Sequence, residues 1–168
     1  SGLRGLGGVT PKSDGLIRPM LDVTREQVEA FLEENYIRHI TDSSNEGDLF
    51  LRNRLRHHVM PLLRAENPSI AVGLSAAAQR IREDACLLDE LAAAVDPTDI
   101  AALRAAPAPL RRRAIEGFLR QNGFPEPSAE HIRQAEGVVF SDNPAARTTF
   151  GGLTLRRSYE KLCADREQ

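Results

Sequence analysis

The sequence predicts a mainly α-helical chain: the C-terminal part of an α/β domain, then a helical domain that ends in a β-hairpin. Apolar residues recur every three or four positions through most of the 168 residues, which is typical of amphipathic helices. The pattern changes near the end, where Gly151-Gly152 separates two short runs with strand-like composition. Near the start, one strand-length apolar run precedes one helix. Because a parallel strand needs neighbours, that pair indicates the later part of a larger α/β domain.

The first part of the chain divides into four predicted segments. Residues 1–14 contain four glycines and little apolar periodicity, so we expect a loop. Residues 16–21 are predicted to form a short buried strand interrupted by proline. Thr24 is a typical N-cap for a helix over about 25–35. Residues 41–48 are rich in side chains that bond local backbone, which predicts another loop.

The rest of the chain is predicted to be helical up to the final hairpin. Expected helices cover about residues 50–66, 69–94, 98–105, 109–122 and 129–139, and the hairpin joins 147–150 to 153–159. We therefore expect an α/β remnant over 1–49, a linking helix over 50–68 that carries site residues, and a helical domain over 69–168.

Composition excludes several classes of protein. A charged fraction of 27% and a hydrophobic fraction of 41% indicate a folded chain that is not disordered throughout. The two cysteines, Cys86 and Cys163, form no CxxC pair and no disulfide framework, which favours a reducing, cytoplasmic setting. No apolar run approaches the ~20 residues of a membrane span, so we expect no membrane partner.

The net charge of −2 is the sum of blocks of opposite sign. Of the 22 cationic residues, 20 are arginine, which either reflects base composition or provides planar contacts to phosphate. Residues 1–49 have 5 bases and 9 acids, whereas residues 103–120 have 5 bases and 1 acid. A surface with separate acidic and basic faces is expected.

The strongest candidate site lies in the predicted helix over 50–66. Arg52 and Arg56 are four residues apart and share a helical face, Asn53 is next to Arg52, and Arg54 lies nearly opposite. Two guanidinium groups on one face can grip phosphate or pyrophosphate. A solvated helix with no ligand is the alternative interpretation.

The polar loop before this helix supplies the other side chains of the candidate site. Asp42, Ser43 and Asn45 can orient an arginine or contact a phosphate group. His39, His57 and His58 are close in sequence, but no cysteine or acid stands at a metal-ligand spacing beside them, so no metal site is predicted. His131 is expected to pack or to cap a helix.

A second basic cluster occupies the predicted helix over 109–122. Arg113 and Arg120 are seven residues apart and share a face, and Arg112 lies beside it. This face either tracks an RNA backbone or pairs with the acids of residues 83–90. The chain has no Walker A motif, no glycine-rich loop between strand and helix, and no nucleophile with a placed base, so it does not look like a complete enzyme.

The order of motifs over the first 68 residues resembles the tRNA(Ile)-lysidine synthetase family of PP-loop ATP pyrophosphatases. The matching segments are Ser1-Gly2-Leu3-Arg4-Gly5-Leu6, Ile17-Arg18-Pro19-Met20-Leu21, Thr24-Arg25-Glu26, Asp42-Ser43-Ser44-Asn45, Arg52-Asn53-Arg54-Leu55-Arg56-His57 and Asn67-Pro68. Residues 70–168 are similar, more loosely, to the helical substrate-binding domain that follows in that family. The resemblance implies a Rossmann-like α/β domain at the start.

The resemblance also implies a reaction. ATP, with Mg, adenylates the cytidine at the first anticodon position of a tRNA(Ile) with a CAU anticodon, and the lysine ε-amine then displaces AMP to form lysidine. The enzyme is a cytoplasmic ligase, and the resemblance leaves a homodimer open. Its ATP-binding SGGxDS loop lies upstream of the matched segments and is absent from these residues, so the chain alone is expected to be inactive.

The resemblance carries over Asp42, Ser43, Asn45, Arg52, Asn53 and Arg56 as positions that frame the active site, with Ser43 expected to bind substrate. Arg54, on the other helix face, is expected to serve structure or RNA. The basic face of Arg112, Arg113 and Arg120 supplies the other candidate substrate-binding positions. Two alternatives stay open at this point. One is another PP-loop RNA-modifying enzyme, such as a thiolating enzyme, and the other is a helical RNA-binding module without catalysis.

Overall fold

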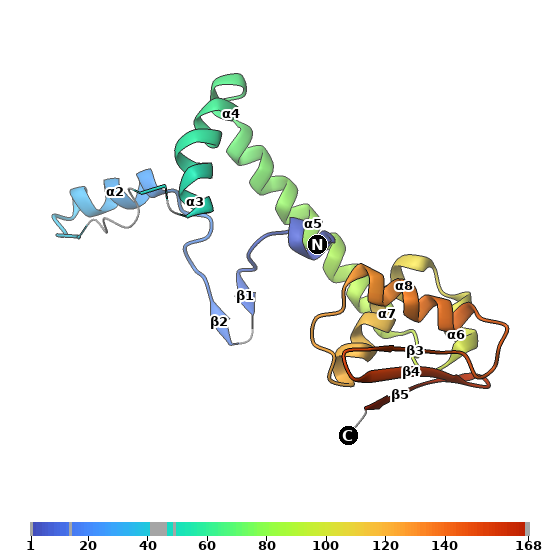
Figure 1. Cartoon of the computed structure of the whole chain (residues 1–168). Helices are drawn as coiled ribbons and strands as arrows, with labels where there is room; N and C mark the ends of the chain where they lie inside the picture. The colour runs from blue at the N-terminus through green and yellow to red at the C-terminus, as the bar shows by residue number, and fades with distance from the viewer. Residues whose placement is uncertain (1, 14, 41–46, 49, 167–168) are drawn as a thin grey trace. The chain divides into compact units, whose positions relative to one another are not determined.

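The computed structural model describes residues 2–13, 15–40, 47, 48 and 50–166. It divides the chain into two compact units, Ser1–Glu83 and Asp84–Gln168. The long helix α5 (Ile70–Ala93) runs from the first unit into the second (Figure 1). The expected predominance of helix is confirmed, and no helix within the described ranges is long and apolar enough to cross a membrane.

The first unit begins with short elements that differ from the expected buried strand. A single helical turn, α1 (Leu3–Leu6), precedes β1 (Lys12–Ser13) and β2 (Leu16–Ile17), which pair antiparallel. Leu16 is 54% exposed and Ile17 is 67% exposed, so the prediction of a buried strand over 16–21 was wrong. Pro19 limits the strand, and within the described residues β2 has only β1 to pair with.

Helix α2 (Arg25–Glu34) confirms the cap expected at Thr24. The Thr24 hydroxyl accepts a hydrogen bond from the Gln27 amide (3.2 Å), and the Gln27 side chain accepts one from the Thr24 amide (2.8 Å). This reciprocal capping box satisfies two backbone donors at the helix start.

The helix expected over 50–66 is present, but it is not a regular α-helix. It consists of α3 (Leu51–Arg54), a π turn labelled η2 (Leu55–Val59) and α4 (Met60–Glu66). Pro61, at the start of α4, has no amide proton and would clash with the carbonyl four residues earlier in a regular helix. A wider turn with i→i+5 bonds just before the proline relieves that conflict.

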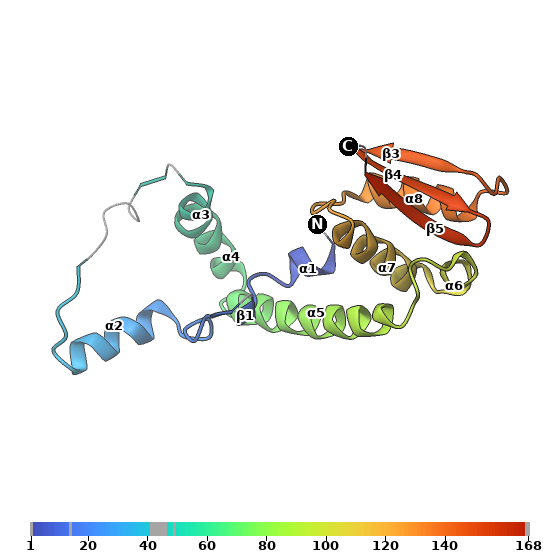
Figure 2. The same cartoon turned by 90° about the horizontal axis from the view of Figure 1, so that it is seen from below.

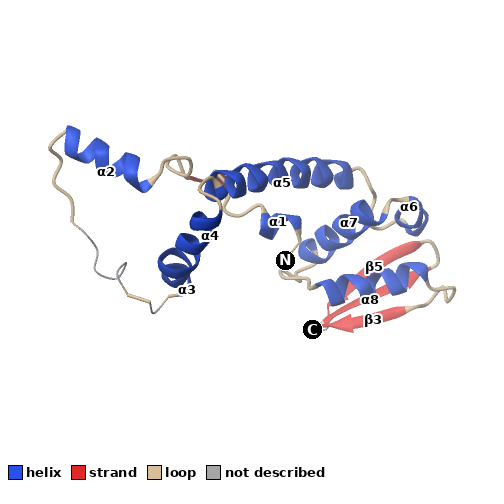
Figure 3. Ribbon diagram, turned by 90° about the horizontal axis from the view of Figure 1, so that it is seen from above, coloured by secondary structure: helices blue, strands red, loops and turns tan. Residues whose placement is uncertain are grey.

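The second unit packs helices on one face of a three-stranded antiparallel sheet. Its helices are α6 (Ile100–Ala105), α7 (Ala108–Gln121) and α8 (Ala129–Phe140), and its strands are β3 (Arg147–Phe150), β4 (Leu153–Ser158) and β5 (Lys161–Arg166). The strand order is β3-β4-β5, and α8 lies across β3 and β4 (Figures 2 and 3). The sequence predicted two of these strands and missed β5.

The core of this unit lies between α6, α7, α8 and the inner face of the sheet. Fully buried side chains come from every one of these layers: Ile100, Leu103, Ile115, Leu119, Val139, Leu153, Leu155 and Leu162. Burying them removes apolar surface from water at about 25 cal/mol per Å². This unit therefore has a hydrophobic core of its own.

The turn between β3 and β4 confirms the expected hairpin. Gly151 and Gly152 have φ angles of 56° and 75°, which glycine tolerates without steric cost. A Cβ at Gly151 would lie 2.6 Å from the ring of Phe124, so the close approach of this ring also requires glycine.

The first unit, in contrast, buries almost nothing within its described residues. Only Gly7 and Asn53 are buried there, whereas large apolar side chains such as Met20, Phe31 and Leu62 are more than half exposed. The described part of this unit thus lacks the apolar core that stabilises the second unit. Neither a parallel sheet nor a Rossmann-like arrangement is seen in the described ranges, and the Rossmann-like fold stays an expectation.

Candidate functional site

The candidate site is centred on the buried side chain of Asn53 in α3. Asn53 is only 1% exposed, and its amide nitrogen donates a 2.6 Å hydrogen bond to the carbonyl of Gly47. A buried amide that lost this partner would cost about 1–3 kcal/mol. Asn53 therefore fixes the end of the preceding loop against the helix.

Two more contacts fasten the same loop. The Arg54 guanidinium donates to the backbone carbonyl of Asp48 (3.0 Å). The Asp48 carboxylate meets two imidazoles at once: Oδ1 lies 3.3 Å from His57 Nδ1, and Oδ2 lies 2.7 Å from His58 Nε2. Adjacent residues can both reach one carboxylate because the π turn separates them by a smaller angle than an α-helix does.

The hydrogen bonds from His58 and His57 hold the pKa of Asp48 below its ordinary value. The carboxylate therefore stays ionised and keeps accepting from both rings. Sequence reasoning missed this contact because Asp48 is nine and ten residues before its partners, outside the spacings of three and four that mark one helix face.

Arg52 and Arg56 are placed differently from Arg54. Both side chains are exposed, and neither forms an ion pair with any residue in the described ranges. The Arg52 guanidinium lies 5.4 Å from the centre of the Phe50 ring, a weak cation–π contact that supports its position. Two arginines are thus available to an external anion, beside a loop that Asn53 and Arg54 hold in place.

The remaining predicted residues of this site lie outside the described residues. These are Asp42, Ser43 and Asn45, so their place relative to Arg52 and Arg56 stays a prediction.

Each arginine of the second cluster has an acidic neighbour within the second unit. Arg111 and Arg112 both contact the Glu136 carboxylate, at 2.9 Å and 3.0 Å. Arg113 lies 3.2 Å from Asp89 and is 16% exposed, whereas Arg120 pairs with Glu116 at 2.6 Å and is 44% exposed. A phosphate bound by Arg112, Arg113 or Arg120 would have to share the guanidinium with these carboxylates.

Two other arginines hold the end of α8. Arg104 donates to the carbonyls of Val139 and Ser141, both at 2.8 Å. Arg157 is 8% exposed and donates to the carbonyls of Ser141 and Tyr159, both at 2.6 Å. Strand alternation predicts that Arg156 and Arg157 face opposite sides of the sheet, but no pattern in the sequence indicates the role of Arg104 or Arg157.

Hydrogen bonding to the Glu90 carboxylate raises the pKa of the Cys86 thiol, which disfavours its thiolate form. Both cysteines are free thiols. In the portion of the chain with described coordinates, no three His, Cys, Asp or Glu side chains are grouped to hold a metal ion.

Comparison with known proteins follows the same division of the chain. Residues 1–63 match a family described as a PP-loop domain, and residues 99–163 match one described as a TilS substrate binding domain. This chain is similar to the tRNA(Ile)-lysidine synthases. The resemblance expected from its motifs is thereby confirmed.

Individual tRNA(Ile)-lysidine synthases match along nearly the whole chain. The protein of that name from Porphyromonas gingivalis is 33% identical and covers 96% of this chain, and the one from Bacillus licheniformis is 31% identical and covers 92%. A third, from Geobacillus kaustophilus, is 37% identical over 87% of the chain. The chain spans 36%, 37% and 35% of the length of these three synthases.

The matched ranges assign the two arginine clusters to different domains. Arg52, Asn53, Arg54 and Arg56 lie in the range that matches the PP-loop domain. The second cluster, strands β3 and β4 and the start of β5 lie in the range that matches the TilS substrate binding domain.

Proposed function

We propose that this chain is part of an ATP-dependent ligase that attaches lysine to the first anticodon cytidine of a tRNA(Ile) with a CAU anticodon. The observation that carries the proposal is a pair of exposed arginines, Arg52 and Arg56, that lies within the PP-loop match and has no acidic partner among the described residues. Such a pair suits a step in which negative charge develops on a phosphate group. The similarity to tRNA(Ile)-lysidine synthases supports the choice of substrates.

The residues of the first unit divide into two roles under this proposal. Arg52 and Arg56 contact the phosphates of ATP or the adenylated intermediate. Asn53 and Arg54 are positioning residues, since both bond the backbone of the loop that ends at Asp48. Asp42, Ser43 and Asn45 complete the phosphate and nucleotide contacts from that loop.

Magnesium is assigned no ligands among the described residues. The Asp48 carboxylate, which is among the described residues, already contacts two imidazoles. We propose ATP with Mg as the cofactor of the whole enzyme, and the chain's own contribution is the arginine pair.

The second unit supplies tRNA contacts in this proposal. Exposed guanidinium groups such as Arg112 contribute affinity that falls with salt, because phosphate contacts release counterions. Replacing Arg112, Arg113 and Arg120 together should therefore flatten the salt dependence of tRNA binding. If the salt dependence of binding is unchanged, these residues have only a structural role, in ion pairs with Glu136, Asp89 and Glu116.

The decisive experiment measures lysidine formation in a full-length enzyme that contains this chain. Arg52→Ala and Arg56→Ala should lower the rate about a hundredfold or more, since they remove charge stabilisation in the transition state. Arg54→Ala is the matched control and should lower the rate of lysidine formation by a smaller factor. Equal losses in all three variants would refute the division of roles.

A second measurement concerns the chain alone. These 168 residues contain no Walker A motif and no glycine-rich loop between a strand and a helix that could cradle the phosphates of ATP. We expect no ATP–pyrophosphate exchange from the isolated chain, and robust exchange would refute this part of the proposal.

A further inference from the structure

Each of the two exposed arginines in the first unit is followed by two residues that bond to the same short segment, Gly47-Asp48. After Arg52, the Asn53 side chain donates to the Gly47 carbonyl (2.6 Å), and the Arg54 guanidinium donates to the Asp48 carbonyl (3.0 Å). Both bonds fasten the backbone of this segment to α3. Because consecutive residues of a helix turn together, the direction in which Arg52 leaves the helix is fixed relative to Gly47-Asp48.

Arg56 has the same relation to this segment through a different group. The two residues that follow it are His57 and His58. Their ring nitrogens lie 3.3 Å and 2.7 Å from the Oδ1 and Oδ2 atoms of the Asp48 carboxylate. Asp48 thus joins two parts of the helix: its backbone bonds the turn that follows Arg52, and its side chain bonds the turn that follows Arg56.

The irregular part of the helix decides how the two arginines are directed. Arg52 lies in α3, whereas Arg56 lies in the π turn η2, in which the Met60 amide donates to the Leu55 carbonyl. Four residues of a regular α-helix turn slightly more than a full circle, and a π turn rotates less per residue, so it brings the two arginines closer to one direction. Pro61 is equally compatible with a simple kink. The two imidazole contacts favour the π turn, because this turn brings adjacent rings to one carboxylate.

The contact between the Asp48 carboxylate and the imidazoles specifies direction more than it stabilises the fold. The Asp48 side chain is 49% exposed, and those of His57 and His58 are 34% and 61% exposed. Exposed pairs of this kind contribute little to stability, because solvent screens them. A hydrogen bond nevertheless weakens steeply when its angle departs from linear, so two bonds to one carboxylate restrict the rotation of the turn.

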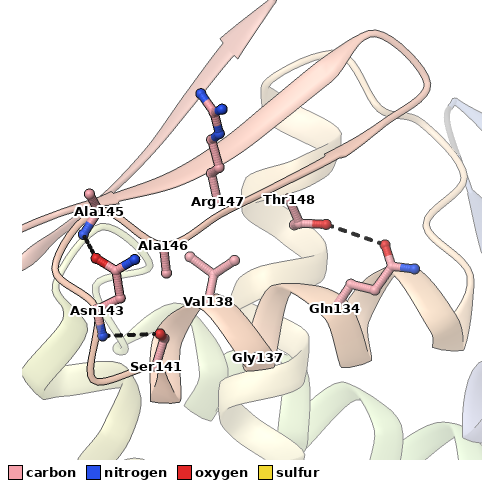
Figure 4. A pocket seen from close by; sticks show the side chains of 9 residues that line it. All are labelled: Gln134, Gly137, Val138, Ser141, Asn143, Ala145, Ala146, Arg147 and Thr148. Atoms are coloured by element: carbon pink, nitrogen blue, oxygen red, sulfur yellow. Dashed lines mark hydrogen bonds between the residues drawn. The ribbon is translucent and has the colours of Figure 1, made fainter.

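A pocket in the second unit offers no comparable pair of cations (Figure 4). It lies between α8 and β3 and has a volume of roughly 520 Å³. Arg147 is the one cation among the described residues that line it, and its side chain projects from β3 away from α8. The paired guanidinium groups whose neighbours are fixed lie in α3 and η2, so the geometry of a phosphate contact is decided there.

We propose that Asp48 is a positioning residue that sets the relative direction of the Arg52 and Arg56 guanidinium groups, so that both contact the same phosphate group. Asp48 touches no substrate in this role and acts through Arg56, by holding the π turn with the two imidazoles. The inference rests on the proposed function, because it needs both arginines to contact phosphate. A misplacement of about 1 Å in an active site lowers a rate by up to about a hundredfold, so the loss of this contact should be measurable.

The test is a double-mutant cycle in a full-length enzyme that contains this chain, with kcat and KM of lysidine formation as the readouts. Asp48→Ala removes both imidazole contacts and should lower kcat about tenfold, while KM for tRNA stays within about twofold. In the Arg56→Ala background the same substitution should lower kcat by less than about twofold, since Arg56 is the group that Asp48 positions. Glu29→Ala is the matched control: the Glu29 side chain is 46% exposed and pairs with Arg25 within α2. It should change kcat by less than about twofold in both backgrounds.

A second variant, Asp48→Asn, keeps the size of the side chain and one acceptor oxygen, so it disturbs the loop less. It should show a smaller loss of kcat with the same dependence on Arg56. An equal factor of loss in both backgrounds, or an unchanged kcat in both Asp48 variants, would overturn the positioning role and leave the proposed function intact. An unchanged rate in Arg56→Ala alone would instead refute the arginine site of the proposed function, and this inference with it.

Discussion

The buried guanidinium of Arg157 allows a quantitative test of the second unit. Arg157 is 8% exposed and donates to two backbone carbonyls, at Ser141 and Tyr159. The next residue back, Arg156, has a side chain that is 45% exposed, and its one ion-pair partner among the described residues is Asp165. The two side chains are chemically identical and differ in burial and partners, so Arg157→Met and Arg156→Met form a matched pair.

The magnitude follows from the partners that each variant leaves behind. Hydrogen bonds from a charged group contribute about 1.5–3 kcal/mol each. In the Arg157→Met variant, the Ser141 carbonyl keeps its hydrogen bond from Arg104, and methionine has no charge to desolvate. The free energy of unfolding should therefore fall by about 2 kcal/mol, which is less than the sum of the two lost hydrogen bonds. Arg156→Met loses one exposed ion pair and should cost less than about 1 kcal/mol.

Urea unfolding of both variants, followed by far-ultraviolet circular dichroism, measures the two free energies of unfolding. We expect the Arg157 variant to be the less stable by at least about 1 kcal/mol, with the slope of the transition unchanged. If both variants unfold at the same urea concentration, Arg157 does not hold the end of α8 and the argument from burial is refuted.

Two further predictions concern the loop contact and the last turn. The pKa of Asp48 is lower in the folded chain than in the unfolded chain. The Asp48 carboxylate therefore stabilises the folded loop at any pH above the ordinary aspartate pKa of about 3.9, and this stabilisation is lost as the pH falls through the lowered pKa of the folded chain. Hydrogen-exchange protection at Gly47 and Asp48 should therefore be higher in the original chain than in the Asp48→Asn variant at neutral pH, and the two should become equal in acid. A ratio of the two protections that stays constant across that pH range would contradict the contact. Tyr159 has a φ of 56° and is 79% exposed, so Tyr159→Asn should stabilise the second unit by about 0.5–1 kcal/mol in urea unfolding, because asparagine tolerates this conformation better and little burial is lost. A loss of stability in that variant would show that the tyrosine ring contributes more than its exposure indicates.

The local signals in the sequence were reliable wherever they rested on a few neighbouring residues. Thr24 caps its helix as expected, and His131, which was expected to pack or to cap, takes part in the capping box of Ser128 at the start of α8. The pair Gly151-Gly152 gives the hairpin turn. Caps and turns depend on bonds within four residues, so the sequence contains all the information they need.

The misses arose where a neighbour in space overrode the local pattern. Leu16 and Ile17 read as a buried strand, but within the described residues they pair only with a two-residue strand and stay exposed. Strand β5 was missed because its turn uses Tyr159 at a positive φ, which gives no glycine signal. The π turn before Pro61 was hidden because apolar spacing of three to four residues fits an α-helix equally well.

By itself, the sequence determined the helical character of the chain, the pair Arg52 and Arg56, and the resemblance to tRNA(Ile)-lysidine synthases, because periodicity and motif order are properties of the chain alone. Only the tertiary structure decided which arginines have partners. It placed the loop backbone against Asn53 and Arg54, Glu136 between Arg111 and Arg112, and the end of α8 under Arg104 and Arg157. The physical reason is that a guanidinium becomes structural or available according to the acceptors that folding brings within about 3 Å of it, and those acceptors come from distant parts of the sequence.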